Sequence, residues 1–284
     1  MHWICNPEKK FNRGFESHFL LFSLQQKDKK WCVFGSKLCG FRPTGRLHVG
    51  HYFSVIKPGQ EGATVLVANY HAPEEKDFED SIDCLEAFDV KNIVYQKDIF
   101  DPDLFFKLLN ISNFNDLKKM TQFKSSDNKT AQLVTYPVLM THDIIGYKEV
   151  LVGEDQTQHV QYARKLIEDY NEKFGTNYPI PIAKVISGRI KDLRDSSKKM
   201  SKSSPQGCLF LDDTPDEIES KIRKAITDEE GLKNLRFLFE KFVSEEVPES
   251  NQKLKELLSE QMIKLSQKIA LYRLAKMGQE MGLY

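Results

Sequence analysis

The sequence predicts an α/β fold with a parallel sheet, followed by a helical domain, and three observations support this. Before Pro205, short apolar runs rich in β-branched residues alternate with helical stretches, which indicates strands linked by helical crossovers. One such run ends at the turn Pro43-Thr44-Gly45 and leads into a predicted helix. After Pro205, helical spacing continues without another strand. We therefore expect an α/β domain over residues 35–204 and a helical C-terminal domain over residues 205–284.

The predicted strands are short and apolar on both faces, as expected of strands buried inside a parallel sheet. They are Leu38–Phe41, Thr64–Asn69, Asn92–Gln96 and Val150–Val152. In Asp77–Phe88, apolar residues recur at helical spacing, and in Asp155–Phe174 they line one face before Gly175, a typical helix cap. The predicted C-terminal helices are Asp216–Ile226, Leu232–Phe242 and Leu254–Met277.

Composition narrows the function only slightly. The chain has 284 residues, of which 40% are hydrophobic, as in an ordinary globular protein. Lys and Arg number 41, as do Asp and Glu, so any contact with RNA needs a local patch. No apolar run approaches the roughly 18 residues of a membrane span. The five cysteines form no C-x-x-C pair, which favours free thiols in a reducing cytoplasm and indicates no metal site. Residues 1–34, basic and aromatic, are expected to form an extension of unassigned role.

The first chemical motif spans Gly40–His51 and reads G-F-R-P-T-G-R-L-H-V-G-H. Turn glycines let the backbone approach a ligand, and a helix N-terminus presents free N–H groups to an anion. The imidazoles of His48 and His51 can bond phosphate oxygens and stabilise charge on a leaving group. A structural alternative is that both histidines cap a helix while Gly50 serves packing. The H-x-G-H pattern also occurs in other nucleotidyl transferases.

The second motif is Lys199–Ser203, which reads K-M-S-K-S. Its lysines alternate with serines, and Met200 provides an apolar anchor. Ammonium groups on a mobile loop can clamp a triphosphate and neutralise departing pyrophosphate. The alternative is a solvated basic loop. Together, the two motifs resemble the paired signatures of class I aminoacyl-tRNA synthetases.

Between the two motifs, Asp143 is a candidate for binding an amino-acid side chain. A buried carboxylate accepts a hydrogen bond from an indole N–H or a phenol O–H, so chemistry alone leaves tryptophan and tyrosine open. Asp143 capping a helix is the structural alternative. The surrounding segments, over residues 36–243, resemble the tryptophanyl-tRNA synthetase family. The matching segments are Met120–Lys124 (M-T-Q-F-K), Tyr136–Met140 (Y-P-V-L-M) and Val152–Gln156 (V-G-E-D-Q).

The resemblance implies a Rossmann-like nucleotide-binding domain that activates L-tryptophan with ATP, accompanied by Mg²⁺, and transfers it to tRNA(Trp). It also implies a cytoplasmic homodimer. The implied catalytic residues are His48, His51, Lys199 and Lys202. The implied ATP site comprises Arg42, Pro43, Thr44, Gly50, His51, Gly153, Glu154, Asp155, Ile190, Lys199, Met200, Ser201, Lys202 and Ser203. The implied tryptophan site comprises Tyr136, Met140, Asp143 and Gln156.

The chain departs from the family in three places. Segment 50–120 is shortened, Ser204 replaces an aspartate, and the chain beyond Gly231 is short. Three other functions therefore stay open: a tyrosine-activating class I synthetase, a small-molecule nucleotidyl transferase, and a non-catalytic synthetase-like RNA-binding protein.

Two surfaces are candidates for partners. Apolar residues of Asp77–Phe88 and Leu104–Met120 would be uncovered on a monomer, which favours a homodimer. The segment Leu254–Met277 has an excess of basic residues that could meet tRNA phosphates, or form an ordinary solvated face. These residues are Lys255, Lys264, Lys268, Arg273 and Lys276. We also expect the chain after Val243 to be dispensable for ATP–pyrophosphate exchange.

Overall fold

The computed structural model describes residues 36–71, 78–186, 188, 190–243 and 246–282. The predicted extension over residues 1–34 lies outside the described residues. Contacts group Gly35–Tyr284 into one compact unit, so the predicted domain boundary near Pro205 stays a prediction.

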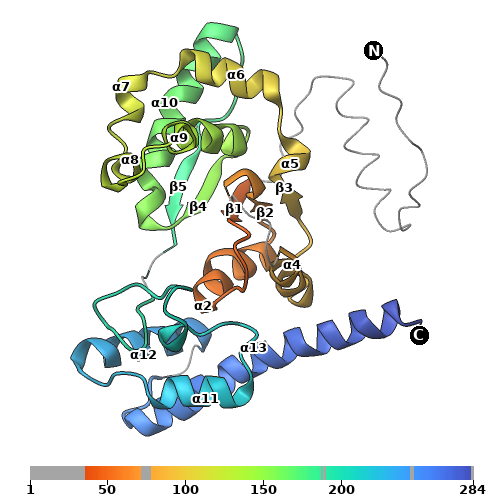
Figure 1. Cartoon of the computed structure of the whole chain (residues 1–284), viewed down its shortest axis with the longest axis vertical. Coiled ribbons are helices and arrows are strands. Elements are labelled where there is room, and N and C mark those ends of the chain that lie inside the picture. The colour runs from red at the N-terminus through yellow and green to blue at the C-terminus, as the bar shows by residue number, and fades with distance from the viewer. Residues whose placement is uncertain (1–35, 72–77, 187, 189, 244–245, 283–284) are drawn as a thin grey trace. The chain divides into compact units, whose positions relative to one another are not determined.

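The described strands form one five-stranded parallel sheet with the order β3-β2-β1-β4-β5 (Figure 1). The strands are β1 (Lys37–Phe41), β2 (Thr64–Val67), β3 (Ile93–Tyr95), β4 (Glu149–Val152) and β5 (Ile182–Val185). The predicted parallel α/β architecture is confirmed. The order reverses beside β1, where Leu38 pairs with Thr64 of β2 on one side and Val150 of β4 on the other. Open α/β sheets bind ligands at such a switch point, beyond the carboxyl ends of the strands.

Helical segments connect the strands. After β1 come α2 (Val49–His51), a π-helical turn η1 (Tyr52–Ile56) and α3 (Lys57–Gln60); after β2 come the 3₁₀ turn η2 (Asn69–His71) and α4 (Phe78–Ala87). Between β3 and β4 lie α5 (Gln96–Ile99), α6 (Pro102–Ile111), α7 (Phe114–Leu117), α8 (Thr121–Ser125) and α9 (Ala131–Ile144). A 3₁₀ turn η3 (Glu154–Gln156) and α10 (Thr157–Phe174) connect β4 to β5.

The two predicted helices of the α/β part are confirmed. Helix α10 ends at Gly175, whose φ of 66° is the left-handed conformation of a glycine cap. Helix α4 matches the expectation within the described residues. The apolar stretch Leu104–Met120, named above as a candidate dimer contact, is divided between two helices, because Ser112 ends α6 and the side chain of Asn113 caps α7.

The C-terminal helices share the core of the sheet. After the 3₁₀ turn η4 (Pro205–Gly207) come α11 (Pro215–Arg223), α12 (Glu229–Phe242) and α13 (Asn251–Glu280), close to the predicted bounds. Leu254, Leu258 and Met262 of α13 are fully buried in the same apolar cluster as Val65 of β2. Removing several buried apolar side chains costs about 2–5 kcal/mol each. The expectation that the chain after Val243 is dispensable is therefore corrected: the structure gives α13 a part in folding.

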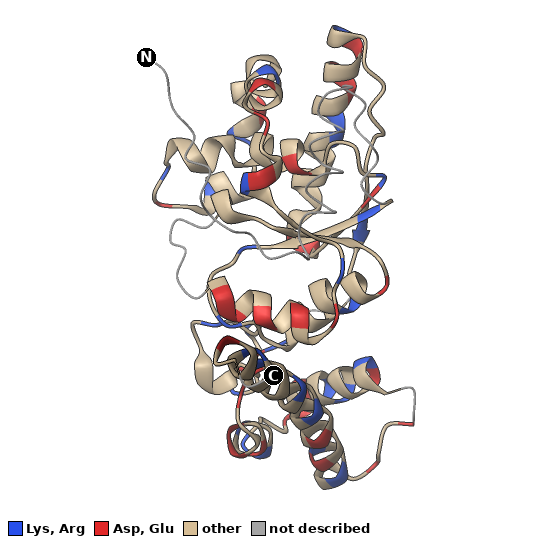
Figure 2. Ribbon diagram, turned by 90° about the vertical axis from the view of Figure 1, so that its right-hand side faces the viewer, with Lys and Arg blue, Asp and Glu red and all other residues tan. Residues whose placement is uncertain are grey.

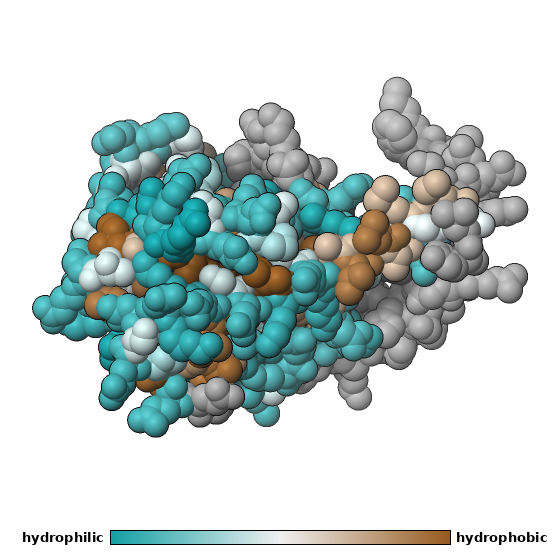
Figure 3. Space-filling view, turned by 90° about the horizontal axis from the view of Figure 1, so that it is seen from below, coloured by the Kyte–Doolittle hydropathy of each residue, from teal (hydrophilic) through white to brown (hydrophobic). Residues whose placement is uncertain are grey.

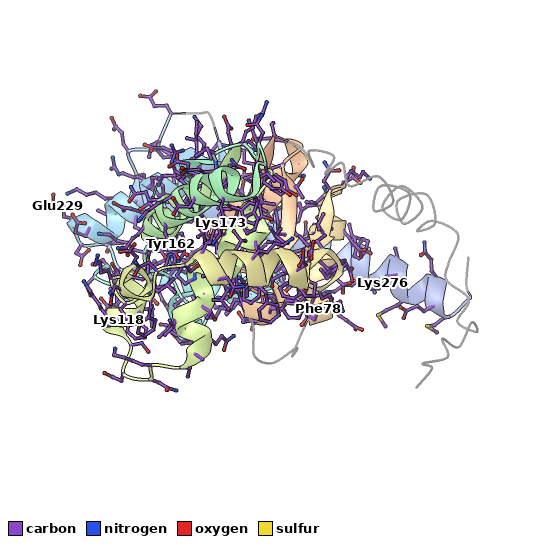
Figure 4. The ribbon with its side chains drawn as sticks, turned by 90° about the horizontal axis from the view of Figure 1, so that it is seen from above. Phe78, Lys118, Tyr162, Lys173, Glu229 and Lys276 are labelled. Carbon is purple, nitrogen blue, oxygen red and sulfur yellow. The ribbon has the colours of Figure 1, made fainter. Side chains whose placement is uncertain are left out.

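Helix α13 is bound to α4 by charge as well as by packing (Figures 2 and 4; Phe78 and Lys276, labelled in Figure 4, lie on the two helices). Arg273 reaches Asp80 at 2.9 Å, and Lys276 Nζ lies 2.6 Å from Asp83 Oδ1. Arg273 also lies 3.3 Å from Asp212, which follows the second motif. These two basic side chains are therefore engaged within the fold.

Two other predicted tRNA-binding lysines of α13 are also engaged. Lys255 donates to the carbonyls of Arg223 and Ala225 at the end of α11, at 2.9 and 3.0 Å. The ammonium of Lys268 lies 5.1 Å from the ring centroid of Phe88. Four of the five basic residues thus have contacts within the fold, Lys264 is exposed without a described partner, and the expected tRNA contact stays a prediction.

The last turns of α13 are instead apolar. Leu271, Leu274, Met277 and Met281 are 56–70% exposed, and brown residues gather toward this end of the chain in Figure 3. Within the described residues, no helix is both long enough and apolar enough to span a membrane.

Candidate active site

A cavity of about 1040 Å³ opens at the carboxyl ends of β1 and β4, at the switch point of the sheet. It brings together residues that lie far apart in the sequence, from both signature motifs and from the segment after β4. The predicted site residues that line it are Arg42, Thr44, His48, Gly50, His51, Gly153, Glu154, Asp155, Gln156, Ile190, Lys199, Met200, Ser201 and Lys202. Pro43, Ser203, Tyr136, Met140 and Asp143 are not among its lining residues.

The two histidines of the first motif do cap a helix. His48 is the N-cap of α2: its Nδ1 accepts from the N–H of Gly50 at 3.0 Å, while Nδ1 of His51 accepts from the N–H of His48 at 3.2 Å. A Cβ on Gly50 would lie 2.6 Å from Cε1 of His48, so the close approach requires glycine. The structural alternative is correct as far as it goes. It leaves the outer edge of both rings available to the cavity that they line.

The caps also fix the tautomers of both rings. Because each Nδ1 accepts a backbone N–H, a neutral ring must carry its proton on Nε2. Burial, with the charges of Lys202 and Lys199, lowers the pKa of His48 to about 4. Burial and the same neighbours, with His48, lower the pKa of His51 well below its ordinary value. At neutral pH, the motif therefore offers two neutral Nε2–H donors rather than two cations.

The second motif is anchored on both sides of its lysines. Met200 is 2% exposed, as its predicted role as an apolar anchor requires, and its N–H donates to the carbonyl of Ile190 at 2.9 Å. Lys202 Nζ reaches back to the first motif, with the carbonyls of Thr44 at 3.2 Å and Gly45 at 3.1 Å. Burial lowers the pKa of Lys202. The hydroxyls of Ser201 and Ser203 bond each other at 2.9 Å.

The segment after the second motif pairs with the first motif. The N–H of Val49 donates to Leu209, and the N–H of Leu211 donates to Leu47, both at 2.9 Å. Arg46, inside the first motif, lies 2.8 Å from Asp212 and 3.1 Å from Asp213. These pairs explain how two motifs about 150 residues apart in sequence line one cavity.

The third wall of the cavity is the turn η3, directly after β4. A Cβ on Gly153 would lie 2.7 Å from the carboxylate of Asp155, so that carboxylate folds back onto the turn. The amide of Gln156 donates to Asp155 at 3.0 Å, and Gln156 Oε1 has no partner although it is buried. Carboxylates at this position can accept hydrogen bonds from ligand hydroxyls.

The predicted tryptophan-site residues Tyr136, Met140 and Asp143 share one face of α9, because they are spaced by four and three residues. Asp143 is 4% exposed and caps no helix: it lies in the last turn of α9 and bonds side chains. Its Oδ2 accepts from the amide of Gln96 at 2.7 Å and lies 3.1 Å from Nε2 of His71. The helix-capping alternative for Asp143 is therefore wrong.

His142 completes the surroundings of this carboxylate. Its Nε2 accepts from the N–H of Asp101 at 3.0 Å, so the neutral ring carries its proton on Nδ1, which lies 3.4 Å from Oδ1 of Asp143. Burial raises the pKa of Asp143, but the hydrogen bonds from His142 and His71 outweigh it, and the pKa lies below its ordinary value. The group is thus a buried, charged acceptor.

Tyr136 is close enough to both Asp143 and the cavity residues Arg42 and Asp155 for their charges to shift its pKa. Burial raises the pKa of Tyr136; the charge of Arg42 lowers it, while those of Asp143 and Asp155 raise it further. The ring of Tyr136 lies between His71 and His159, with centroids 4.4 and 5.3 Å away. Tyr136 therefore interacts by charge with both the acceptor Asp143 and the cavity residues Arg42 and Asp155.

Sequence reasoning missed several residues of the site. Gln96 and His71 surround Asp143, and Phe53, Phe237 and Lys241 line the cavity. Gln96 was expected only as the end of a strand, and Phe237 and Lys241 lie in a helix assigned to another domain. Among the described residues, no group of three or more His, Cys, Asp or Glu side chains could hold a metal ion.

The chain resembles known proteins over most of its length. A family model described as class I tRNA synthetases (W and Y) matches residues 64–281. A tryptophan–tRNA ligase of Tropheryma whipplei is 36% identical over 222 residues, covering 69% of this chain and 66% of that protein. One of Helicobacter pylori (strain 26695) is 35% identical over 224 residues, covering 68% of each. The chain thus spans about two thirds of the length of these curated relatives.

Solved structures agree. The crystal structure of tryptophanyl-tRNA synthetase from Mycoplasma pneumoniae superposes with a TM-score of 0.72 at 27% identity, covering 84% of this chain and 87% of that one. Tyrosyl-tRNA synthetase from Archaeoglobus fulgidus, at 20% identity and a TM-score of 0.66, shows the shared fold alone. With both signature motifs meeting at one cavity and the family model matching most of its length, the chain belongs to the class I tRNA synthetases of the W and Y family.

Proposed function

We propose that the chain is a tryptophan–tRNA ligase, which activates L-tryptophan with ATP and transfers it to tRNA(Trp). One observation carries the proposal: Tyr136 interacts by charge both with a buried, charged acceptor, Asp143, and with Arg42 and Asp155 of the cavity lined by both phosphate-handling motifs. Curated relatives that are 35% and 36% identical to the chain are named tryptophan–tRNA ligases. Because both motifs are intact, the proposal favours an enzyme over a non-catalytic relative.

The proposed first step is attack of the tryptophan carboxylate on the α-phosphorus of ATP. A new C–O–P linkage forms, the bond between the α-phosphorus and the bridging oxygen breaks, and pyrophosphate leaves with its electron pair. The neutral Nε2–H groups of His48 and His51 would donate to phosphate oxygens as charge builds on them. Lys199 and Lys202 would balance the charge of the departing pyrophosphate. No proton transfer is needed, so neutral histidines suffice.

The proposed ATP site consists of the sequence-predicted residues that line the cavity, with η3 beside the ribose. Asp155 and Glu154, which follow β4, supply acceptors for ribose hydroxyls. Mg²⁺ would accompany ATP, because this ion keeps much of its water and binds chiefly through substrate phosphates. Its coordination is therefore expected to come mostly from the nucleotide rather than from a protein cage.

In the proposed tryptophan site, Asp143 accepts the indole N–H. Tyr136 and Met140 lie on the same face of α9 and would flank the ring, since a thioether packs well against an aromatic system. The unpaired Oε1 of Gln156 is a candidate acceptor for the substrate ammonium group. An ionised carboxylate held by donors can only accept, which suits an indole that can only donate.

The second step, transfer to the terminal ribose of tRNA(Trp), would use the same cavity. We also propose a cytoplasmic homodimer, in keeping with the prevalence of two-fold symmetric oligomers. Phe106 and Phe114, in the region expected at a dimer contact, are each 59% exposed. Light scattering at micromolar concentration would give twice the chain mass of 32.9 kDa if the dimer is correct.

The proposal is tested by charging of tRNA(Trp) with labelled tryptophan, using the wild-type chain and Asp143→Ala. The wild type should charge the tRNA, and the variant should lose about 1–3 kcal/mol of tryptophan binding, with its KM for ATP little changed. A variant that charges tRNA with an unaltered KM for tryptophan would refute the role of Asp143. A wild-type chain that charges no tRNA(Trp) would refute the function.

A further inference from the structure

One face of α12, in the C-terminal part of the chain, lies against the segment that leads into the second motif. Asn234, Phe237 and Lys241 are spaced by three and four residues, so they share this face. Phe237 and Lys241 line the cavity, although neither belongs to a signature motif.

Asn234 holds the backbone of this segment on both sides. Its Oδ1 accepts from the N–H of Lys191 at 2.9 Å, and its Nδ2 donates to the carbonyl of Lys191 at 3.0 Å. The backbone of Lys191 forms an antiparallel β-bridge with that of Lys199, and the carbonyl of Ile190 accepts from the N–H of Met200. Helix α12 is therefore connected through one segment to the second motif.

Phe237 packs directly on Gly188 of the same segment. A Cβ on Gly188 would lie 1.7 Å from the ring of Phe237, and the φ of this glycine is +101°, so the contact needs a residue without a side chain. The contact is at the tip of the ring, because Cζ is its nearest atom, and the ammonium of Lys241 lies 5.2 Å from the ring centroid. These two contacts fix where the ring faces.

The lining of the cavity is chemically divided. One group is cationic: Arg42, Lys199, Lys202 and Lys241. The other is apolar and comes from the crossover segment, η1 and α12: Ile186, Gly188, Ile190, Phe53 and Phe237. A triphosphate is anionic and an adenine base is flat and apolar, so one ATP molecule matches both groups.

We propose that Phe237 is a nucleotide-site residue, whose ring packs against the adenine base of ATP, with Lys241 holding that ring in place. The inference rests on the proposed function for the identity of the nucleotide. A residue of the C-terminal helix α12 would then contact the adenine base, in addition to the residues that follow the strands of the sheet.

The test compares Phe237→Ala and Phe237→Leu in ATP–pyrophosphate exchange. Base stacking on an aromatic ring is lost on substitution by alanine, and the KM for ATP should rise by about 5- to 100-fold. Phe237→Leu should show much of this loss. The KM for tryptophan should not change. Lys233→Ala, on α12 but paired with Glu229 outside the cavity, is the matched control.

Two competitive inhibitors separate contact with the base from displacement of the segment. Adenosine should inhibit Phe237→Ala more weakly than the wild type, while inorganic tripolyphosphate should inhibit both equally. A loss for tripolyphosphate as large as that for adenosine would mean that the ring only supports the second motif, and would overturn the proposal. An unchanged KM for ATP in Phe237→Ala would overturn it as well.

Calorimetric titration with adenosine keeps this inference separate from the proposed function. If the wild type supports no tryptophan-dependent exchange, the function fails. Weaker adenosine binding by Phe237→Ala than by the wild type would still support the assignment of the ring, and equal binding would contradict it.

Discussion

The side-chain amide of Gln96 donates to Asp143 Oδ2 at 2.7 Å, and both residues are almost completely buried. The orientation of the amide is fixed, because its Oε1 accepts the N–H of Tyr70 at 2.8 Å. Gln96 is thus a positioning residue for the carboxylate proposed to bind the indole. Gln96 begins α5 directly after β3, and Asp143 lies in the last turn of α9, at the other end of the same crossover between β3 and β4.

Replacing this amide by a carboxylate should make tryptophan binding depend on pH. In Gln96→Glu, two carboxylates share one buried site, so the pKa of one rises strongly and a proton is held between them. The KM for tryptophan should be raised and should change between about pH 6 and 8, where the wild type, with its lowered Asp143 pKa, stays constant. Gln267→Glu, on the exposed side of α13, is the control. A pH-independent KM in Gln96→Glu would contradict the positioning role.

The lowered pKa of His48 predicts a specific loss of stability in acid. The folded pKa is about 4 and the ordinary value is 6.5, so below pH 6.5 the unfolded chain binds a proton that the folded chain excludes. This contribution to stability is complete above pH 6.5 and is lost progressively as the pH falls toward 4. Thermal unfolding should show a smaller decline over this range in His48→Asn, which retains an N-cap acceptor. An identical decline in both proteins would contradict the assignment.

Lys202 should contribute to the rate of adenylate formation more than to ATP binding. Its ammonium reaches the turn of the first motif, where departing pyrophosphate would gain charge. Lys202→Ala should lower kcat for exchange by roughly 10²–10³, as for loss of one electrostatic stabiliser. Lys198→Ala, exposed and paired with Asp195, should be close to wild type. A Lys202→Ala protein with normal kcat and only a raised KM for ATP would exclude this role.

The contact between α13 and α4 should stabilise the fold rather than bind tRNA. A double-mutant cycle on Lys276 and Asp83, measured by urea unfolding, should give a coupling of about 1 kcal/mol, because the pair is partly buried. Lys276→Ala should leave the KM for tRNA unchanged, as should Lys264→Ala if no basic patch exists. A raised KM for tRNA in Lys276→Ala at normal stability would restore the original expectation.

Much of the fold could be predicted from sequence periodicity. Strands such as Thr64–Val67 are buried on both faces, and α10 has a clear apolar stripe and a glycine cap, so both signals are local. Strand β5 gave no such signal, because Ile182 and Val185 are half exposed at the edge of the sheet. The sequence also did not show that α13 packs in the same core as the sheet. Apolar spacing predicts that a helix has a buried face, but it does not tell which core that face joins.

The site was predictable only where residues are close in sequence. Residues His48 and Lys202 stand in recognisable motifs, and both line the cavity. Gln96 and Phe237 reach the site through tertiary packing, and nothing in the neighbouring sequence marks them. The ion pairs of Arg273 and Lys276 could not be predicted, because local charge counts ignore the acidic residues of α4, which lie about 190 positions away in the chain.

The most direct test of the central claim is ATP–pyrophosphate exchange by the purified chain with each amino acid in turn. A charged acceptor held by Gln96 and His71 should reject phenylalanine, and the thioether of Met140 on the same face of α9 should favour an indole over a phenol, so tryptophan should support exchange with a kcat/KM at least about 100-fold above that for tyrosine or phenylalanine. Exchange that is fastest with tyrosine, or absent with every amino acid, would contradict the proposed function.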